Sequence, residues 1–136
     1  MTEVPEIDLR YAQLEIGQEL GVASFLLDAE RVKQYRLLFG DTRPVKEGDP
    51  VPPFMLAMLC HRLLADQPKR PPGSIHVRQR SSFLGLAPVG TVYKVRGRVE
   101  EKWVKNGRPW VTFDLEGFLE NGPVVYRSRT TSILGG

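Results

Sequence analysis

The sequence has little of what would assign it at once to a secreted or membrane class. Its 136 residues include one cysteine, Cys60, so no internal disulfide can form, which is typical of a protein from a reducing compartment. No stretch approaches the roughly 18 consecutive apolar residues that cross a bilayer. The acidic start MTEVPEIDLR also lacks the apolar run of a signal peptide. We therefore expect a cytoplasmic protein without a membrane partner.

Neither sign of charge is in large excess. The net charge is +3, and the basic residues are dispersed along the chain rather than gathered in an arm or in one helix. No motif of the kinds that read grooves or stack bases is present. We expect no nucleic-acid partner, and a smaller anionic ligand fits the charge equally well. No His, Cys or carboxylate group has metal-ligand spacing, which predicts that no metal binds.

The N-terminal half begins with a predicted strand and a short helix. Residues 20–27 have the apolar and β-branched content of a buried strand. Asp28 follows as the expected N-cap of a helix over residues 29–39. Gly40 is expected to end that helix, because glycine tolerates the left-handed conformation at a helix C-terminus.

A second helix is expected to begin at Pro52-Pro53, because proline suits the first helical turn, where its missing N–H would have no partner. Apolar residues occupy almost every face of its first three turns: Phe54, Met55, Leu56, Met58, Leu59, Leu63 and Leu64. A helix that is apolar all round is a buried one. We therefore expect residues 53–66 to form the core element, with Cys60 as a small apolar core residue.

The C-terminal half predicts four antiparallel strands. Strand-like runs cover residues 74–83, 91–102, 109–120 and 124–134, and two Asn-Gly pairs, Asn106-Gly107 and Asn121-Gly122, favour tight hairpins between them. In the first run, alternation sets Ile75, Val77 and Gln79 on one face and His76, Arg78 and Arg80 on the other. We expect one α+β domain, residues 1–136, in which a long curved antiparallel sheet wraps around the apolar helix.

The loop after the first helix carries the most informative residues. It reads Gly40-Asp41-Thr42-Arg43-Pro44, which places a carboxylate at a helix end, and no histidine follows within the next ten residues. The element order resembles the hotdog fold. The loop resembles the signature of the MaoC-like dehydratase and hydratase family: Gly-Asp, one variable residue, Asn-Pro, one variable residue, then His. Gly40, Asp41 and Pro44 match it, whereas Arg43 replaces the Asn and Lys46 replaces the His.

Other segments resemble the same family. PPFMLAML (Pro52 to Leu59) is similar to the Pro-Pro-x-Phe helix start of the family's N-terminal dehydratase halves, those similar to the dehydratase region of fungal fatty acid synthase. Residues 75–79, 89–91 and 127–131 fit as well, and the resemblance covers nearly the whole chain.

The resemblance implies chemistry on an acyl thioester. Family members add water to a trans-2-enoyl thioester or remove it from an (R)-3-hydroxyacyl thioester. An Asp and a His share the proton transfers across one bound water, and a backbone N–H near a helix N-terminus stabilises the enolate oxygen. Asp41 is therefore the first catalytic candidate and His76 the second. The residues expected to bind substrate are Gly40, Arg43, Pro53 and Phe54, together with two arginines named below.

Each catalytic candidate has a structural alternative. Asp41 can instead form an Asx turn towards Arg43. Lys46 is expected to be exposed and charged, because a lysine acts as a base only when burial lowers its pKa, so it does not replace the missing His. His61 is expected at the margin of the core, and His76 on a solvated or dimer face.

A basic set projects from the predicted strands: Arg78, Arg80, Lys94, Arg96 and Arg98. Arg78 and Arg80 are expected to bind the phosphates of coenzyme A or of a carrier-protein phosphopantetheine, because the planar guanidinium matches phosphate. The alternative is a solvated face on which these bases pair with Glu100 and Glu101.

Three functions follow from these observations. The first is an (R)-specific enoyl-thioester hydratase or 3-hydroxyacyl-thioester dehydratase component. It would act on an acyl-CoA or acyl-carrier-protein thioester with no further cofactor. Without the His, the chain can be the substrate-binding half of such an enzyme, and we expect a homodimer or a heteromer with a second hotdog subunit. The second is a hotdog acyl-CoA thioesterase, against which residues 54–60 carry no carboxylate. The third is a non-catalytic acyl-thioester binding or regulatory module.

Overall fold

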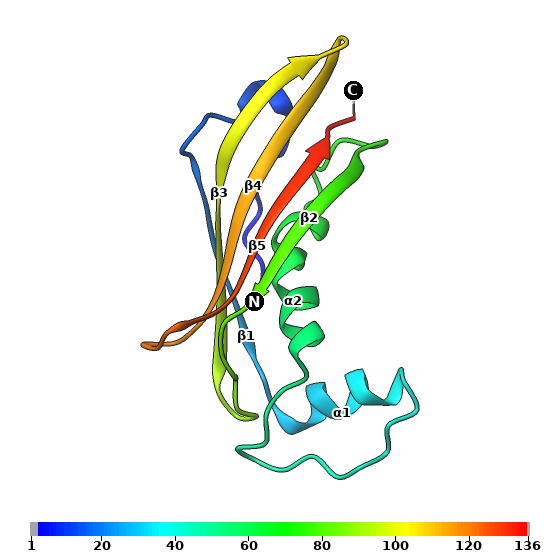
Figure 1. Cartoon of the computed structure of the whole chain (residues 1–136), viewed down its shortest axis with the longest axis vertical. Coiled ribbons are helices and arrows are strands. Elements are labelled where there is room, and N and C mark those ends of the chain that lie inside the picture. Colours follow the sequence, from blue (N-terminus) through cyan, green and yellow to red (C-terminus); the bar gives the residue numbers. More distant parts are fainter. Residues whose placement is uncertain (1–2, 136) are drawn as a thin grey trace.

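A computed structural model describes residues 3–135, so residues 1, 2 and 136 of the expected domain lie outside the described part. Its elements are η1 (Tyr11–Gln13), β1 (Glu19–Leu26), α1 (Ala29–Leu37), α2 (Pro53–Ala65), β2 (Ile75–Phe83), β3 (Val92–Lys105), β4 (Arg108–Leu119) and β5 (Val124–Ile133). The five strands form one antiparallel sheet in the order β1-β3-β4-β5-β2 (Figure 1). The predicted strands and both predicted helices are confirmed.

Local sequence signals act as expected at the hairpins and at the start of α1. Asn106 and Asn121 have φ angles of 52° and 56°, the conformation that tight Asn-Gly hairpins require. The Asp28 carboxylate accepts a hydrogen bond from the Arg31 N–H at 2.8 Å and caps α1. Both predictions are confirmed.

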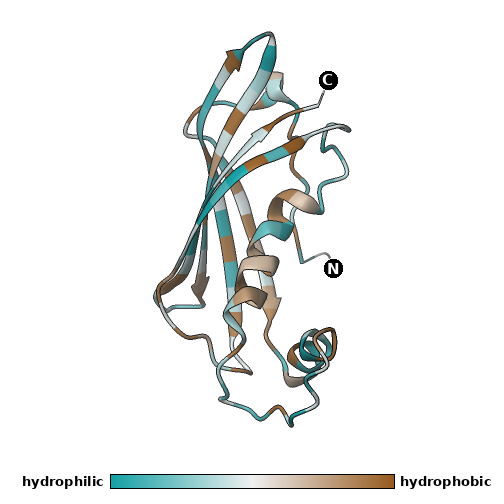
Figure 2. Cartoon of the chain, turned by 45° about the vertical axis from the view of Figure 1, so that its right-hand side comes forward, coloured by the Kyte–Doolittle hydropathy of each residue, from teal (hydrophilic) through white to brown (hydrophobic). Residues whose placement is uncertain are grey.

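The sheet curves around α2, which packs on its inner face (Figures 1 and 2). One side of α2 is buried through Met55, Leu56, Leu59, Cys60 and Leu63. The Tyr93 hydroxyl of β3 donates a hydrogen bond to the Leu56 carbonyl at 3.0 Å. Gly117 of β4 makes room for the Tyr93 ring, because a Cβ at position 117 would overlap it. Packing and a buried hydrogen bond thus fix the core helix to the sheet.

The other side of α2 is not covered by this chain, so the expectation of a helix buried all round is wrong. Phe54 is 72% exposed and Met58 45% exposed. Beside them lies β2, an edge strand that is exposed along its whole length. The Phe54 and Phe83 rings meet edge to face with their centroids 5.6 Å apart. We call Phe54, Met58 and β2 the open flank.

The strict alternation predicted near the start of β2 is also wrong. The register against β5 shifts between His76 and Arg78, which pair with Ser132 and Thr131, so Val77 is an extra residue that bulges from the strand. His76 consequently lies on the side of α2, where it lines a cavity with His61. The predicted common face of His76, Arg78 and Arg80 does not exist, because the two arginines lie on the opposite, outer side of the sheet.

Candidate functional site

The loop that carries Asp41 begins where α1 ends. α1 stops at Leu37, two residues before the predicted Phe39, because the N–H groups of Phe39 and Gly40 bond to the carbonyls of Arg36 and Leu37 in a tighter turn. Gly40 closes this turn with a φ of 73°, the left-handed conformation that the sequence predicted. The Asp41 N–H then bonds to the Arg36 carbonyl at 3.0 Å, which holds Asp41 next to α1.

Both carboxylate oxygens of Asp41 accept hydrogen bonds from Arg43. Oδ1 accepts from the Arg43 backbone N–H at 3.1 Å and from its Nε at 3.0 Å, and Oδ2 accepts from Nη2 at 2.7 Å. The Arg36 Nε lies 3.9 Å from Oδ2. The Asx turn that the sequence offered as the structural alternative is therefore present. The hydrogen bonds from Arg43 hold the pKa of Asp41 well below its usual range, so Asp41 is a weak proton acceptor.

Within residues 3–135, the structure brings no side chain to the place of the missing histidine. Lys46 is exposed, and its backbone N–H donates to Asp49 Oδ2 at 2.9 Å. His61 and His76 line a cavity of about 160 Å³ to which no residue of 40–46 contributes. The predicted catalytic pair of Asp41 and His76 is therefore not brought together.

Asp41 does border a space that a ligand can enter. We call this the α1/α2 hollow, a space of about 450 Å³ lined by Tyr35, Arg36, Phe39, Asp41, Arg43, Pro50, Val51, Pro52, Pro53 and Leu86. Two of the predicted substrate-binding residues, Arg43 and Pro53, line it. Gly40 closes the adjacent turn, and the Phe54 side chain lies on the open flank. Because proline has no N–H, the first N–H of α2 belongs to Phe54, and N–H groups of a first helical turn lack partners within the helix.

His61 joins α2 to β5. Its Nδ1 lies 2.8 Å from the Ala57 carbonyl, which can only accept, so Nδ1 carries the proton. Nε2 lies 3.1 Å from the hydroxyls of both Ser128 and Thr130, which are 3.0 Å apart, so one hydroxyl donates to Nε2 and the other donates to its neighbouring hydroxyl. Burial lowers the pKa of His61, which keeps the ring neutral. The prediction of a histidine at the core margin is confirmed.

Sequence reasoning missed the hydroxyl partners of His61. Ser128 and Thr130 are both buried, and two hydroxyl residues spaced by two on a strand share one face. That spacing was a usable signal, because a buried polar face of a strand needs a hydrogen-bonding group on the helix that packs against it.

The predicted basic set divides into two parts. Lys94, Arg96 and Arg98 form ion pairs with Glu120, Glu116 and Asp114, respectively. They make the solvated charged face that the sequence offered as the alternative, with partners other than the expected Glu100 and Glu101. Arg78 and Arg80 line a hollow on the outer side of the sheet instead. The sheet separates them from α2, so they do not join Asp41 at one site.

The remaining candidates do not add a reactive group. Within residues 3–135, no three His, Cys, Asp or Glu side chains converge as a metal site would require. Burial raises the pKa of the Cys60 thiol, which fits a core residue rather than a nucleophile. Among the described helices, none is long and apolar enough to span a bilayer.

Comparison with known proteins shows similarity at the level of structure. No family model and no curated protein matches the sequence. The (R)-hydratase from A. caviae involved in PHA biosynthesis is 24% identical, with 90% of this chain and 98% of that chain covered and a TM-score of 0.70. R-hydratase PhaJ1 from Pseudomonas aeruginosa is 21% identical, with 94% and 86% covered and a TM-score of 0.77. The chain has the hotdog fold.

A third similar structure is a complex of two kinds of subunit. The C-terminally truncated HadBC (3R-hydroxyacyl-ACP dehydratase) complex from Mycobacterium tuberculosis contains a chain that is 15% identical, with 87% of this chain and 96% of that chain covered and a TM-score of 0.64. Similarity to solved structures at these low identities establishes the fold and not the function. The predicted fold class is confirmed.

Proposed function

We propose that this hotdog chain is the substrate-binding half of a MaoC-like (R)-specific enoyl-thioester hydratase or 3-hydroxyacyl-thioester dehydratase, of the type similar to the N-terminal half of the fungal dehydratase region. The state of Asp41 carries the proposal. Arg43 occupies both of its oxygens, and no described histidine lines the α1/α2 hollow. Adding or removing water needs one proton moved at the α-carbon and another moved at the water or hydroxyl oxygen of the β-carbon, and the described residues at this hollow present no free pair of groups for these transfers.

The α1/α2 hollow supplies the contacts that an acyl thioester needs for binding. Tyr35, Phe39 and Leu86 give it apolar wall area, which suits an acyl chain. The Phe54 N–H directly follows Pro53, which lines the hollow, and the N-terminus of a helix favours negative charge, so in this proposal that N–H donates to the thioester carbonyl. In this proposal these groups bind the substrate, an acyl-CoA or an acyl-carrier-protein thioester, and a partner subunit transfers the protons.

The open flank is the surface proposed for that partner. The edge strand β2 offers N–H and C=O groups to another strand, and Phe54 and Met58 add exposed apolar area beside it. The HadBC complex, one chain of which has the same fold, joins different subunits. We therefore favour a heteromer with a second hotdog subunit over a homodimer.

Binding and turnover of crotonyl-CoA test this proposal. We expect the wild-type chain to bind crotonyl-CoA in calorimetry without loss of the enoyl-thioester absorbance. Arg43→Asn/Lys46→His rebuilds the signature and frees Asp41, so this variant is expected to gain hydration. Arg43→Gln/Lys46→Gln removes the same two charges without adding an imidazole, and we expect it to stay inactive.

Other outcomes separate the alternatives. Hydration by the wild-type chain that disappears in Asp41→Ala would show a complete hydratase rather than a binding half. Release of free CoA would favour a thioesterase, and failure to bind the thioester contradicts all three functions. Binding without turnover also fits a regulatory module, so we expect the chain to co-purify from its source with a second hotdog chain that carries the intact signature.

A further inference from the structure

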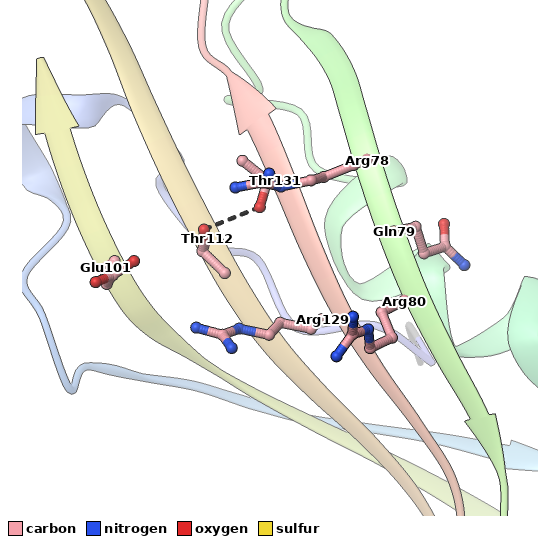
Figure 3. Close-up of a pocket in the computed structure, with 7 residues that line it drawn as sticks. All are labelled: Arg78, Gln79, Arg80, Glu101, Thr112, Arg129 and Thr131. Atoms are coloured by element: carbon pink, nitrogen blue, oxygen red, sulfur yellow. Dashed lines mark hydrogen bonds between the residues drawn. The ribbon is translucent and has the colours of Figure 1, made fainter. Parts of the chain in front are cut away.

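The outer side of the sheet carries an arginine cluster that the proposed function does not use. Arg78 and Arg80 of β2 and Arg129 of β5 line one hollow of about 400 Å³, together with Thr112 and Thr131 (Figure 3). Arg80 and Arg129 are cross-strand partners in the register of β2 and β5. Like charges directly opposite each other destabilise a sheet, so an anion bound beside this pair would stabilise it.

The charge balance of the hollow differs from that of the neighbouring surface. Within residues 3–135, neither Arg78 nor Arg80 forms an ion pair, while the Arg129 Nε lies 2.9 Å from Glu100 Oε2 and Glu101 lines the hollow. Other arginines on the same face are each paired with acids of β4: Arg96 with Glu116, and both Arg98 and Arg127 with Asp114. Of these described arginines, Arg78 and Arg80 are therefore the two without an acid partner, and both lie at the hollow.

The hollow also contains a hydrogen-bond donor that is not used. The hydroxyls of Thr112 and Thr131 lie 2.9 Å apart, and each residue is 3% exposed. One hydroxyl must donate to the other, which leaves the second proton without an acceptor among residues 3–135. Since both threonines line the hollow, this proton can be donated to a ligand there.

We propose that this hollow binds a phosphate group. A phosphate carries up to two charges and three terminal oxygens, which match two or three guanidinium forks and one hydroxyl better than a carboxylate does. An acidic protein surface fits less well, because the two arginines without an acid partner lie together in one hollow and are not spread across the face. The inference does not rest on the proposed function, since this hollow shares no lining residue with the α1/α2 hollow.

Calorimetry with two probes, inorganic phosphate and adenosine 3′,5′-bisphosphate, tests the site and its source of phosphate. We expect the wild-type chain to bind at least one of them and Arg78→Gln/Arg80→Gln to bind it at least about tenfold more weakly. Thr112→Val/Thr131→Val, which keeps the shape of both side chains, is expected to weaken binding about fivefold. Lys69→Gln/Arg108→Gln removes two exposed charges elsewhere and is the matched control, with affinity expected within about twofold of wild type.

Each result decides for or against the site. Tighter binding of the bisphosphate than of phosphate supports a nucleotide ligand, and equal binding supports recognition of the phosphate group alone. Loss of affinity in the control equal to that in Arg78→Gln/Arg80→Gln would show general charge attraction and overturn the inference. Failure of both probes to bind the folded wild-type chain, checked by circular dichroism, would overturn it as well.

Discussion

The α2 core and the Asp41 loop are neighbours in the chain, yet different kinds of contact hold them in place. Leu59 packs inside the curved sheet, and Tyr93 reaches α2 from a distant strand. In the loop, Asp41 contacts Arg36 and Arg43, which are only a few positions away. Buried packing tolerates little change, whereas exposed ion pairs contribute little to stability. The fold can therefore persist while the loop changes its chemistry.

The largest expected effect that tests this comparison is that of Leu59→Ala. Leu59 is 1% exposed, and its truncation leaves a cavity that the neighbours fill only in part. We expect the free energy of unfolding to fall by about 2–5 kcal/mol. Leu38→Ala, at a residue that is 76% exposed after α1, is the control and should stay within about 0.5 kcal/mol of wild type. Urea denaturation followed by circular dichroism measures both, and equal losses would contradict the comparison.

Gly117→Ala is expected to have the next largest effect. The added Cβ would overlap the Tyr93 ring and disturb the hydrogen bond to the Leu56 carbonyl. Overpacking of this kind lowers the free energy of unfolding by about 1–3 kcal/mol. The control is Gly85→Ala, because its Cβ would make an ordinary contact with Val125 at 3.4 Å. A wild-type denaturation midpoint for Gly117→Ala would show that the core is less closely packed than the comparison requires.

A smaller effect is expected from pH at the boundary between α2 and the sheet. Burial lowers the pKa of His61 below its usual value near 6.5. As pH falls below about 6.5, the unfolded chain binds a proton that the folded chain does not, so stability decreases until the folded pKa is reached. His61→Gln should abolish this dependence. Denaturation midpoints at about pH 7.5 and 5.5, above the range of ordinary carboxylates, measure the difference, and identical slopes in the two proteins would contradict it.

The core was predictable because its signals are local and repeated. The apolar residues of α2 predict a core helix, and the Asn-Gly pairs before β4 and β5 predict tight hairpins. Each of these signals acts locally and does not depend on the rest of the chain. The exposure of Phe54 and Met58 was not predictable, because exposed apolar residues on a helix have the same sequence pattern as core residues. The bulge at Val77 depends on pairing with β5 and leaves no mark in the composition of β2.

The candidate site was predictable only in part, for a different reason. The position of Gly40 at φ 73° followed from the helix end, and the Asx turn of Asp41 was one of two readings of the same residues. Choosing between the catalytic role and the Asx turn required the position of the Arg43 side chain. No sequence pattern predicts where an exposed side chain such as that of Arg43 points. The separation of Arg78 from Asp41 by the sheet likewise depends on topology rather than on the local sequence.

Arg43→Ala is expected to have the smallest effect on stability and, within the loop, the largest effect on the pKa of Asp41. Loss of the guanidinium removes its hydrogen bonds to Asp41 but keeps the backbone N–H bond to Oδ1, so the pKa of Asp41 should rise towards its usual value. The thermal midpoint should fall only slightly, because the ion pair that is lost is exposed. A carbon-13 NMR titration of the Asp41 carboxyl measures this rise. Arg36→Ala is the control, and it should raise the pKa less, because its Nε is 3.9 Å away. An equal rise in both variants would mean that the field of the whole helix end, and not Arg43, sets the charge of Asp41. The charge of Asp41 would then depend on α1 as a whole, in the same way that the position of α2 depends on the sheet.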